Sequence, residues 1–456
     1  MSILWKDLRI SIPVKVKKIT DLKIVQKCNE HAFAEITAVL EEEQNLENIY
    51  SMNEKTNIVL FDKQSVLFSG VLMNLQISMI QGICTIVLFV KSYSVFMDFK
   101  QKKRSFQYEQ NKYQSILEQI IKTEYQGDFI DTASNGKTQN RVIIQYDETD
   151  WEFLLRLASQ LNTVVIPDIL CNKPNMWIGL PNGETHQQQY YHYKITRHTD
   201  KYMEQKLNYK EKSLLDFTYL EIQAEQNYAL GDILYYQNNP FVIIEKEMNL
   251  KQGKMLCRYK ICKKESVFTN IFYNIALRGL SIDAKVIDVK QCYLKLHLCI
   301  DEKQDIKQCH WFQYNTPYAA EGQTGFYMMP QIGDSVKLYF PKEDETQAYV
   351  REVNRECGKQ NTKTKDTQIK RFGTIYNTEM ILSPNSIDFI ASEQNCSVNM
   401  NYSDGIVLTG AENIKINTDN LMQFEANKIL VQAKDRIIAS TSKANVVVDE
   451  IVHFKA

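Results

Sequence analysis

The residues best suited to bind a metal ion lie close together near the middle of the chain. His297, Cys299, Cys309 and His310 carry the nitrogen and sulfur donors that zinc prefers. Structural zinc sites usually pair their ligands with about two to four residues between them, and none of the ten cysteines forms C-x-x-C. We therefore interpret the scattered cysteines as small buried apolar residues, and we expect neither a metal nor a cofactor.

Catalysis would require a nucleophile beside a base, or a pair of carboxylates. The sequence contains no G-x-S-x-G, no H-E-x-x-H and no phosphate-binding loop. Asp and Glu are abundant at turns, so a glycosidase pair stays an alternative, and a cell-wall or polysaccharide hydrolysis assay would test it. The sequence assigns no catalytic residue, and we expect a protein that is not an enzyme.

Charge and hydropathy exclude further classes of protein. Lys plus Arg number 54 and Asp plus Glu 55, so the chain lacks the excess of positive charge typical of duplex-wrapping proteins. The basic segment KQKKRSF, at Lys100–Phe106, is interpreted as a solvated loop or strand end. We find neither a signal peptide nor a run of apolar residues long enough to span a membrane, and we expect synthesis in the cytoplasm.

The first half of the chain alternates β-rich stretches with two helices. In Gly70–Ser78, residues Val71, Met73, Leu75 and Ile77 alternate and predict one buried strand face. One helix is predicted from the apolar stripe Tyr113, Ile116, Leu117, Ile120 and Ile121. A second is predicted from Trp151, Leu154, Leu155, Ala158 and Leu161. Asp147, Thr149 or Asp150 is expected to cap this second helix, because short polar side chains accept from its free N–H groups.

Two further β units follow. Gly231–Lys264 reads as a meander, with turns at Asn238–Pro240 and Gln252–Gly253. About five strands within residues 269–356 predict a small barrel of the OB type. Some OB barrels bind single-stranded nucleic acid on aromatic side chains, which leaves a second alternative. Tyr314, Tyr318, Phe326 and Tyr327 have few cations near them, so we expect them to pack at a domain or subunit contact, with no nucleic acid bound.

The C-terminal stretch repeats an apolar residue every eight positions. The repeat comprises Leu382, Ile390, Val398, Ile406, Ile414, Met422, Leu430, Ile438, Val446 and Phe454. A second apolar residue often follows two positions later, as in Met400 and Leu408, and residues i and i+2 share one face of a strand. Each octad is therefore one short strand plus a corner, with one apolar row.

An apolar row of this width leaves a single chain without an interior. Three copies wound about one axis would bury it, which predicts a trimeric, intertwined β-helix. An ordinary antiparallel sheet is the alternative, but its loops would vary in length and the spacing would drift.

These features together resemble the central spike of contractile phage tails and VgrG proteins of type VI secretion. VIIQYDETDWEFLLRLASQL resembles the helix motif of the hub, carried by Tyr146, Glu148, Asp150, Trp151, Phe153 and Leu154. YMMPQIGDSVKLYF resembles the OB signature, in which Pro330, Gln331, Ile332, Gly333 and Asp334 form a turn before a strand. FMDFKQKKRSFQ and WFQYNTPYAAEGQTGFYMMP resemble neighbouring segments of the family, and the likeness covers nearly the whole chain.

The resemblance implies a mainly β fold and a mechanical role. The expected domains are a hub barrel (1–105), a helix-containing hub segment (106–204), a second hub barrel (205–268), the OB domain (269–356), a linker (357–374) and the octad spike (375–456). It implies a homotrimer that joins tail tube and baseplate proteins to a PAAR-like tip protein or effector. It also implies that the assembled particle is ejected and pierces a target membrane, in a phage, a bacteriocin or a secretion machine.

Overall fold

The computed structural model describes residues 3–41, 49, 51–187, 193–200, 202–203, 213–267, 269–316, 325, 327–354, 362–391, 396–443 and 445–448. The chain divides into two compact units, Met1–Glu356 and Cys357–Ala456. Phe454, Tyr318, Phe326 and residues 357–361 of the expected linker lie outside the described residues. No described helix has the length and apolar character needed to cross a membrane.

A 12-stranded sheet dominates the first unit. Its order is β1-β4-β5-β6-β3-β2-β16-β17-β14-β13, and β12 and β15 attach beside β16. The strands are β1 (Leu8–Ser11), β2 (Val16–Lys27), β3 (Phe33–Leu40), β4 (Asn57–Asp62), β5 (Ser65–Ile80), β6 (Ile83–Lys91), β12 (Thr185–His186), β13 (Tyr193–Arg197), β14 (Thr218–Ala224), β15 (Ile233–Tyr236), β16 (Asn239–Lys251) and β17 (Lys254–Cys262). The antiparallel pair β2–β16 joins the strands of the two expected hub barrels into one sheet.

Strand β5 corrects one prediction from the alternating pattern. A bulge between Leu72 and Asn74 places Val71 and Leu75 on opposite faces, because an inserted residue reverses the side-chain alternation. Leu75 and Ile77 pair with the buried Leu88 and Ile86 of β6, but Ile77 itself is exposed, as is Met73 in the bulge. The four apolar side chains therefore do not share one face.

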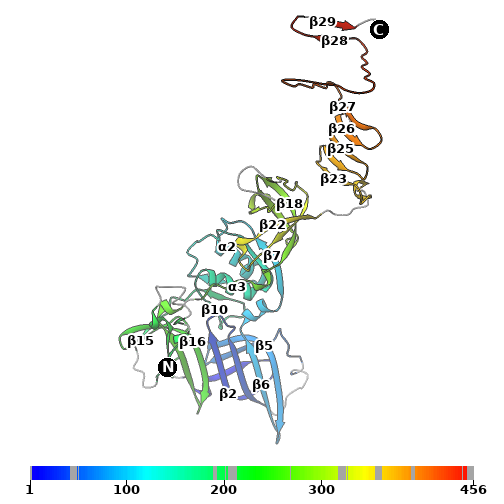
Figure 1. The fold of residues 1–456 in the computed structure, drawn as a ribbon. Helices are drawn as coiled ribbons and strands as arrows, with labels where there is room; N and C mark the ends of the chain where they lie inside the picture. Colours follow the sequence, from blue (N-terminus) through cyan, green and yellow to red (C-terminus); the bar gives the residue numbers. More distant parts are fainter. Residues whose placement is uncertain are drawn as a thin grey trace. The chain divides into compact units, whose positions relative to one another are not determined.

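The helical segment supplies a second core. It comprises the 3-10 helix η2 (Tyr93–Asp98), β7 (Gln101–Phe106), α2 (Tyr113–Leu117), the π-helix η3 (Glu118–Glu124), β8 (Phe129–Asp131), β9 (Ile143–Thr149), α3 (Asp150–Gln160), β10 (Val165–Pro167) and β11 (Met176–Ile178). The predicted stripe from Tyr113 to Ile121 is buried. In the stripe predicted for the second helix, Trp151, Leu154 and Ala158 are buried, and Leu155 and Leu161 are partly buried. In Figure 1, α2 and α3 lie between the 12-stranded sheet and β18–β22.

The predicted small barrel follows. Its five strands have the order β20-β19-β18-β21-β22. They are β18 (Ser281–Lys290), β19 (Tyr293–Leu298), β20 (Trp311–Gln313), β21 (Ser335–Tyr339) and β22 (Tyr349–Asn354). A bridge from Tyr314 to Val350 brings the two edge strands together. Val142 and Ile144 of the helical segment pack into its core, so barrel and hub share buried apolar surface.

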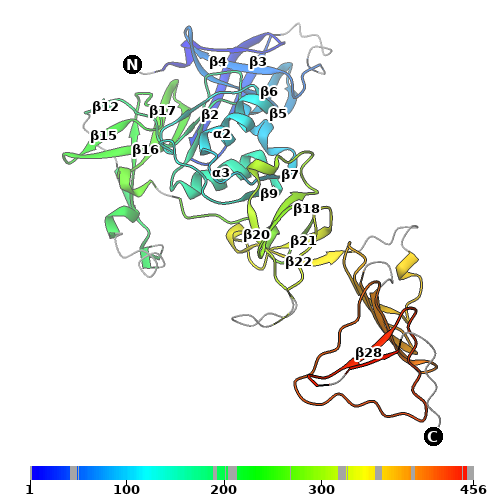
Figure 2. The same ribbon diagram turned by 90° about the horizontal axis from the view of Figure 1, so that it is seen from above.

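The second unit contains short strands with few buried residues. β23 (Lys370–Gly373), β24 (Glu379–Leu382), β25 (Ser386–Ala391), β26 (Cys396–Asn401) and β27 (Gly405–Thr409) form an antiparallel meander. β28 (Ile437–Ser440) and β29 (Asn445–Val448) form a hairpin. Between β27 and β28 the chain follows a wide triangular path (Figure 2).

Candidate functional site

Helix α3 begins at a capping box. The Thr149 hydroxyl accepts from the Glu152 N–H at 3.1 Å, and the Glu152 carboxylate accepts from the Thr149 N–H at 2.9 Å. Such a cap stabilises a helix by about 1 kcal/mol. Of the three predicted capping residues, Thr149 therefore performs this role.

Asp150, the next motif residue, anchors strand β7 instead of capping. Its buried carboxylate accepts from Arg104 Nη2 at 2.6 Å and from the Tyr125 hydroxyl at 2.7 Å, and it also pairs with Lys102. Lys102 and Arg104 belong to the basic segment that the sequence suggested to be solvated. That expectation is wrong for these two cations, because they neutralise a buried carboxylate.

Glu148 and Arg156 connect the hub to the OB barrel. The guanidinium of Arg156, which is 2% exposed, binds both oxygens of Glu148 at 2.8 Å and Glu345 Oε1 at 2.6 Å. Burial alone would lower the pKa of Arg156, but the two carboxylates raise it, so the group stays charged. Burial raises the pKa of Glu148, an effect that Arg156 opposes. Glu345 begins the 3-10 helix η8 (Glu345–Gln347), so this triad spans the junction of helix and barrel.

Trp151 contacts the hub sheet through His31, with the two ring centroids 4.2 Å apart. Phe153 stacks on Phe106, and Leu154 fills the helical core. Tyr146 packs against the OB core, and its carbonyl accepts from Asn274 Nδ2 at 2.7 Å. All six motif residues therefore hold α3 against its surroundings.

Ser94, His31 and Asp98 form a chain that has the composition of a hydrolase triad. His31 Nδ1 lies 2.8 Å from Ser94 Oγ, and Nε2 lies 3.4 Å from Asp98 Oδ2. Ser94 is 1% exposed and its hydroxyl also meets that of Ser92 at 2.9 Å. A nucleophile must leave room for a reacting atom about 3 Å away, which this packing does not provide. The three residues form a structural link in which Ser94 and the His31 side chain are buried and Asp98 is partly exposed.

The OB turn precedes β21, as its sequence suggested. The Gln331 N–H donates to the Asp334 carboxylate at 2.8 Å, and the Asp334 N–H donates to the Gln331 carbonyl at 3.0 Å. Gly333 has φ of 95°, a conformation that favours glycine, and its N–H donates to the Val286 carbonyl at 2.8 Å. Pro330 is buried and Ile332 exposed.

Three of the four metal-type side chains have other partners. His297 Nε2 bonds the Asp301 carbonyl at 2.9 Å, Cys309 Sγ lies 3.3 Å from the Asp305 carbonyl, and His310 pairs with Glu109 at 2.7 Å. Cys299 is exposed. The part of the chain that the structure describes contains no group of His, Cys, Asp and Glu able to hold a metal ion.

The aromatic residues of the barrel also differ in their surroundings. Tyr314 belongs to the buried OB core. Tyr327 is exposed, and its hydroxyl donates to the Gln291 carbonyl at 3.0 Å. Tyr314 is therefore not free to stack on a base.

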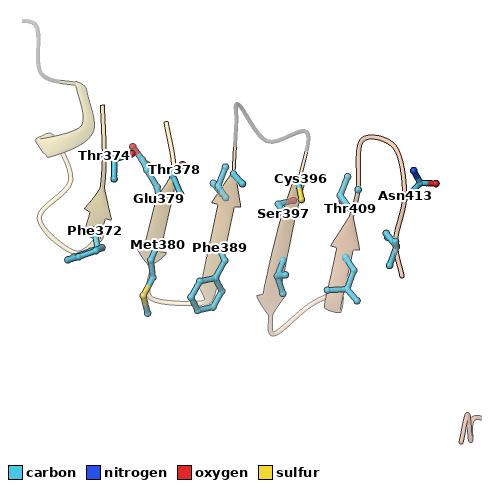
Figure 3. Close-up of a pocket in the computed structure, with 16 residues that line it drawn as sticks. Phe372, Thr374, Thr378, Glu379, Met380, Phe389, Cys396, Ser397, Thr409 and Asn413 are labelled. Carbon is cyan, nitrogen blue, oxygen red and sulfur yellow. The ribbon is translucent and has the colours of Figure 1, made fainter. Parts of the chain in front are cut away.

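The meander of the second unit has one apolar face. Strand register places two rows of apolar side chains on this face. The first row comprises Phe372, Met380, Phe389, Val398 and Leu408. The second row comprises Leu382, Ile387, Met400 and Ile406. Figure 3 shows Phe372, Met380 and Phe389 side by side along the open groove of about 580 Å³ that this face lines. Ile390 pairs with Glu379 and Ser397, so it lies on the opposite, more polar face. Leu382 and Val398 therefore share the apolar face, whereas Ile390, the octad position between them, does not.

Residues 410–436 contain three octad positions, and the structure assigns no paired β-strand to them. Within the described residues, no backbone–backbone hydrogen bond involves this segment. Ile406, Met422 and Leu430 are 70%, 41% and 78% exposed, and Ile414, Ile438 and Val446 are likewise exposed. The chain by itself therefore leaves both its polar backbone and its apolar side chains uncovered.

Sequence reasoning did not select Arg156, Glu345 or His31. Arg156 gave a signal, since a cation amid the apolar residues of a helix is rarely buried without a partner. Glu345 and His31 gave none, because their partners are far away in the sequence.

One part of the chain matches a known protein family. Residues 287–352, which include the Pro330–Asp334 turn, match the type VI secretion system/phage-baseplate injector OB domain. No curated protein sequence matches the chain.

Two solved structures have a similar fold. One is the Escherichia coli c3393 protein, described as a component of the type VI secretion system with structural similarity to the T4 bacteriophage tail proteins gp27 and gp5. It is 13% identical, with 76% of this chain and 99% of that chain covered and a TM-score of 0.55. The other is the Francisella PdpA–VgrG complex in its half-lidded form, 10% identical, with 88% and 87% covered and a TM-score of 0.58. The chain thus has the fold of VgrG-like hub and spike proteins of phage tails and type VI secretion systems, and its OB domain is of the phage-baseplate injector family.

Proposed function

We propose that the chain is the homotrimeric hub and membrane-piercing central spike of a contractile injection system. The observation that carries this proposal is the segment 410–436, whose apolar octad positions are exposed and whose backbone has no ladder within the described chain. Burial of exposed apolar rows is favourable by about 25 cal/mol per Å², and backbone N–H and C=O groups that become buried with them need hydrogen-bond partners. Two further copies would supply both.

An intertwined trimer suits a piercing role. Strands that pair between chains separate only when all three chains unwind, which makes unfolding slow under load. At the other end of the chain, the Arg156–Glu148–Glu345 triad and the shared core at Val142 and Ile144 fix the OB barrel to the hub. Force applied to the hub would therefore reach the barrel through buried contacts.

The partners follow from this role. The hub would contact tail tube and baseplate proteins, and the far end of the spike would carry a PAAR-like tip protein or an effector. The assembled particle would be ejected toward the outside or into a target cell, where the spike pierces the membrane rather than binding it. The similarity to a type VI secretion component supports this location.

We also propose that the chain is not an enzyme. The burial of Ser94 supports this, since the Ser94–His31–Asp98 chain has no access for a substrate. A cell-wall hydrolysis assay on the purified chain should give the rate of the buffer blank, and turnover that is lost in Ser94→Ala would contradict this part of the proposal.

The oligomeric state provides the main test. Mass measurement in solution should give three chains per particle, and a monomer would contradict the proposal. Ile414→Asp should abolish the trimer, because it would place three unpaired carboxylates in one apolar layer, at several kcal/mol each. Asn417→Asp adds the same charge three residues later, off the octad position, and should leave the trimer intact. Equal masses for the two variants would show that Ile414 does not face inward.

A further inference from the structure

Lys246 is a buried lysine in the first unit, with no hydrogen bond or ion pair to another described residue. Lys246 of β16 pairs in register with Gln26 of β2 and Tyr259 of β17, on the face that also carries the buried Met248 and Cys257. Lys246 is 6% exposed. Within the described residues, the ammonium forms no hydrogen bond or ion pair. Asp232 and Cys257 act on it only through charge at longer range.

The carboxylate of Asp232, whose charge acts on Lys246, already accepts other hydrogen bonds. It accepts from the Glu184 and Ala229 N–H groups, both at 2.9 Å, and from His186 at 3.1 Å. Lys246 therefore has no counter-ion among the described residues. Burying an ammonium without a counter-ion is costly, so an anion that reached Lys246 would gain by pairing with it.

The Lys246 side chain lines a cavity of about 270 Å³. The apolar part of its wall is formed by Leu67, Ile166, Ile169, Leu170, Trp177 and Leu230. Gln26 is held at the wall by its bond from Nε2 to the Pro167 carbonyl, at 3.0 Å. Leu170 is half exposed and so marks the side that opens to solvent. Strands β2, β5 and β16, the β10–β11 segment and the loop at Leu230 thus line a small chamber with mixed walls, which hold one positive group, Lys246, and one carboxylate, Asp168.

We propose that this chamber binds a single carboxylate carried on a short apolar body, with Lys246 as its counter-ion. Its volume is about nine times that of a water molecule in the liquid, which admits a branched acid of four to six carbons or one C-terminal leucine. Asp168 also lines the chamber, and its charge repels a dianion such as phosphate more strongly than it repels a single carboxylate.

The state of the lysine is compatible with this role. Burial lowers the pKa of Lys246 to about 8, an effect that the charges of Cys257 and Asp232 oppose. The ammonium is thus still mainly protonated at neutral pH and can attract an anion. The mechanical role of the trimer makes no use of this site.

Calorimetric titration of the full chain tests the proposal with four probes: isovalerate, N-acetyl-glycyl-leucine, the C-terminal amide of that dipeptide, and inorganic phosphate. We expect at least one of the two carboxylates to bind, and the amide and phosphate to bind at least about tenfold more weakly. Binding of isovalerate alone identifies a free acid as the ligand, whereas binding of the dipeptide alone identifies a chain terminus.

Three variants make the result specific. Lys246→Met should weaken carboxylate binding by at least about tenfold. Leu170→Glu, at the exposed wall, should weaken it through repulsion without disturbing the core. Lys251→Met, on the exposed end of the same strand, should leave it unchanged. The proposal is overturned if neither carboxylate binds, if the amide or phosphate binds as tightly as they do, or if Lys246→Met retains the affinity.

Discussion

Arg156 Nη1 donates to Glu345 Oε1 at 2.6 Å across 189 residues of sequence. This ion pair, with Glu148 on the other side of the guanidinium, is buried where helix α3 meets the OB barrel. The helix motif and the barrel are therefore coupled by charge as well as by apolar packing.

Removing Arg156 should loosen this junction. Arg156→Met leaves two buried carboxylates without a counter-ion, and loss of one partner in such a pair costs about 3–5 kcal/mol. Urea unfolding followed by tryptophan fluorescence should show a lower midpoint. Lys103→Met is the control, since Lys103 pairs with Asp147 at 3.2 Å on the surface and should contribute less than about 1 kcal/mol. Equal midpoints for the two variants would contradict the coupling.

The two faces of the spike meander should respond differently to charge. Val398→Asp places a carboxylate on the apolar face and should prevent trimer formation. Ile390→Asp adds the same charge on the opposite face, beside Ser397, and should preserve it. Sedimentation of both variants measures this difference. If Ile390→Asp is the more disruptive, the octad count is right at this position and the strand pairing is not.

His31 should make the hub sensitive to acid. Burial lowers its pKa from 6.5 to about 4, outweighing the attraction of Asp98. The unfolded chain binds the proton first, so stability is complete above pH 6.5 and falls as the pH drops toward 4. The loss at the lower limit is about 3 kcal/mol. The groups that face His31 are Ser94, Asp98, Trp151 and, through charge, Lys91.

His31→Gln should reduce this acid-dependent loss while keeping a polar side chain beside Ser94. Melting temperatures of parent and variant between pH 4 and 7 would show it. An equal slope in both proteins would assign the acid sensitivity to other groups.

Lys246 should lower the stability of the hub at neutral pH. Its folded-state pKa of about 8 lies below the ordinary 10.5, so the folded chain holds this proton less tightly than the unfolded chain does. Stability should therefore rise between pH 8 and 10.5, and Lys246→Met should stabilise the protein at pH 7 by about 3 kcal/mol. Cys257 and Tyr259, which lie beside it, have raised pKa values, and burial is the main cause.

Differential scanning calorimetry of the parent, Lys246→Met and Lys251→Met would measure this effect. The Lys251 variant should match the parent. If the parent and Lys246→Met have the same melting temperature at pH 7, the lysine has a partner in solution.

Sequence patterns predicted the elements that are stabilised by interactions between residues close in sequence. The stripe and cap of α3 could be recognised from Trp151, Leu154 and Thr149, because helix spacing and capping depend on neighbours in sequence. The β5 prediction failed at Met73 because a bulge depends on the partner strand. Ile390 lies on the other face because β24 and β25 pair Leu382 with Ile387, which puts the odd-numbered residues of β25 on the apolar face. Arg156 could be suspected of needing a partner, but only the fold brings Glu345 to it.

The change of face at Ile390 has a consequence for how three chains would find their alignment. A column of identical rungs can slide by one rung with loss only at its ends, so a perfectly regular repeat specifies its stagger weakly. The meander from β23 to β27 departs from the eight-residue rhythm, and three such irregular sheets match one another in a single offset. The start of the spike would thus fix the relative axial offset of the three chains along the rest of the spike.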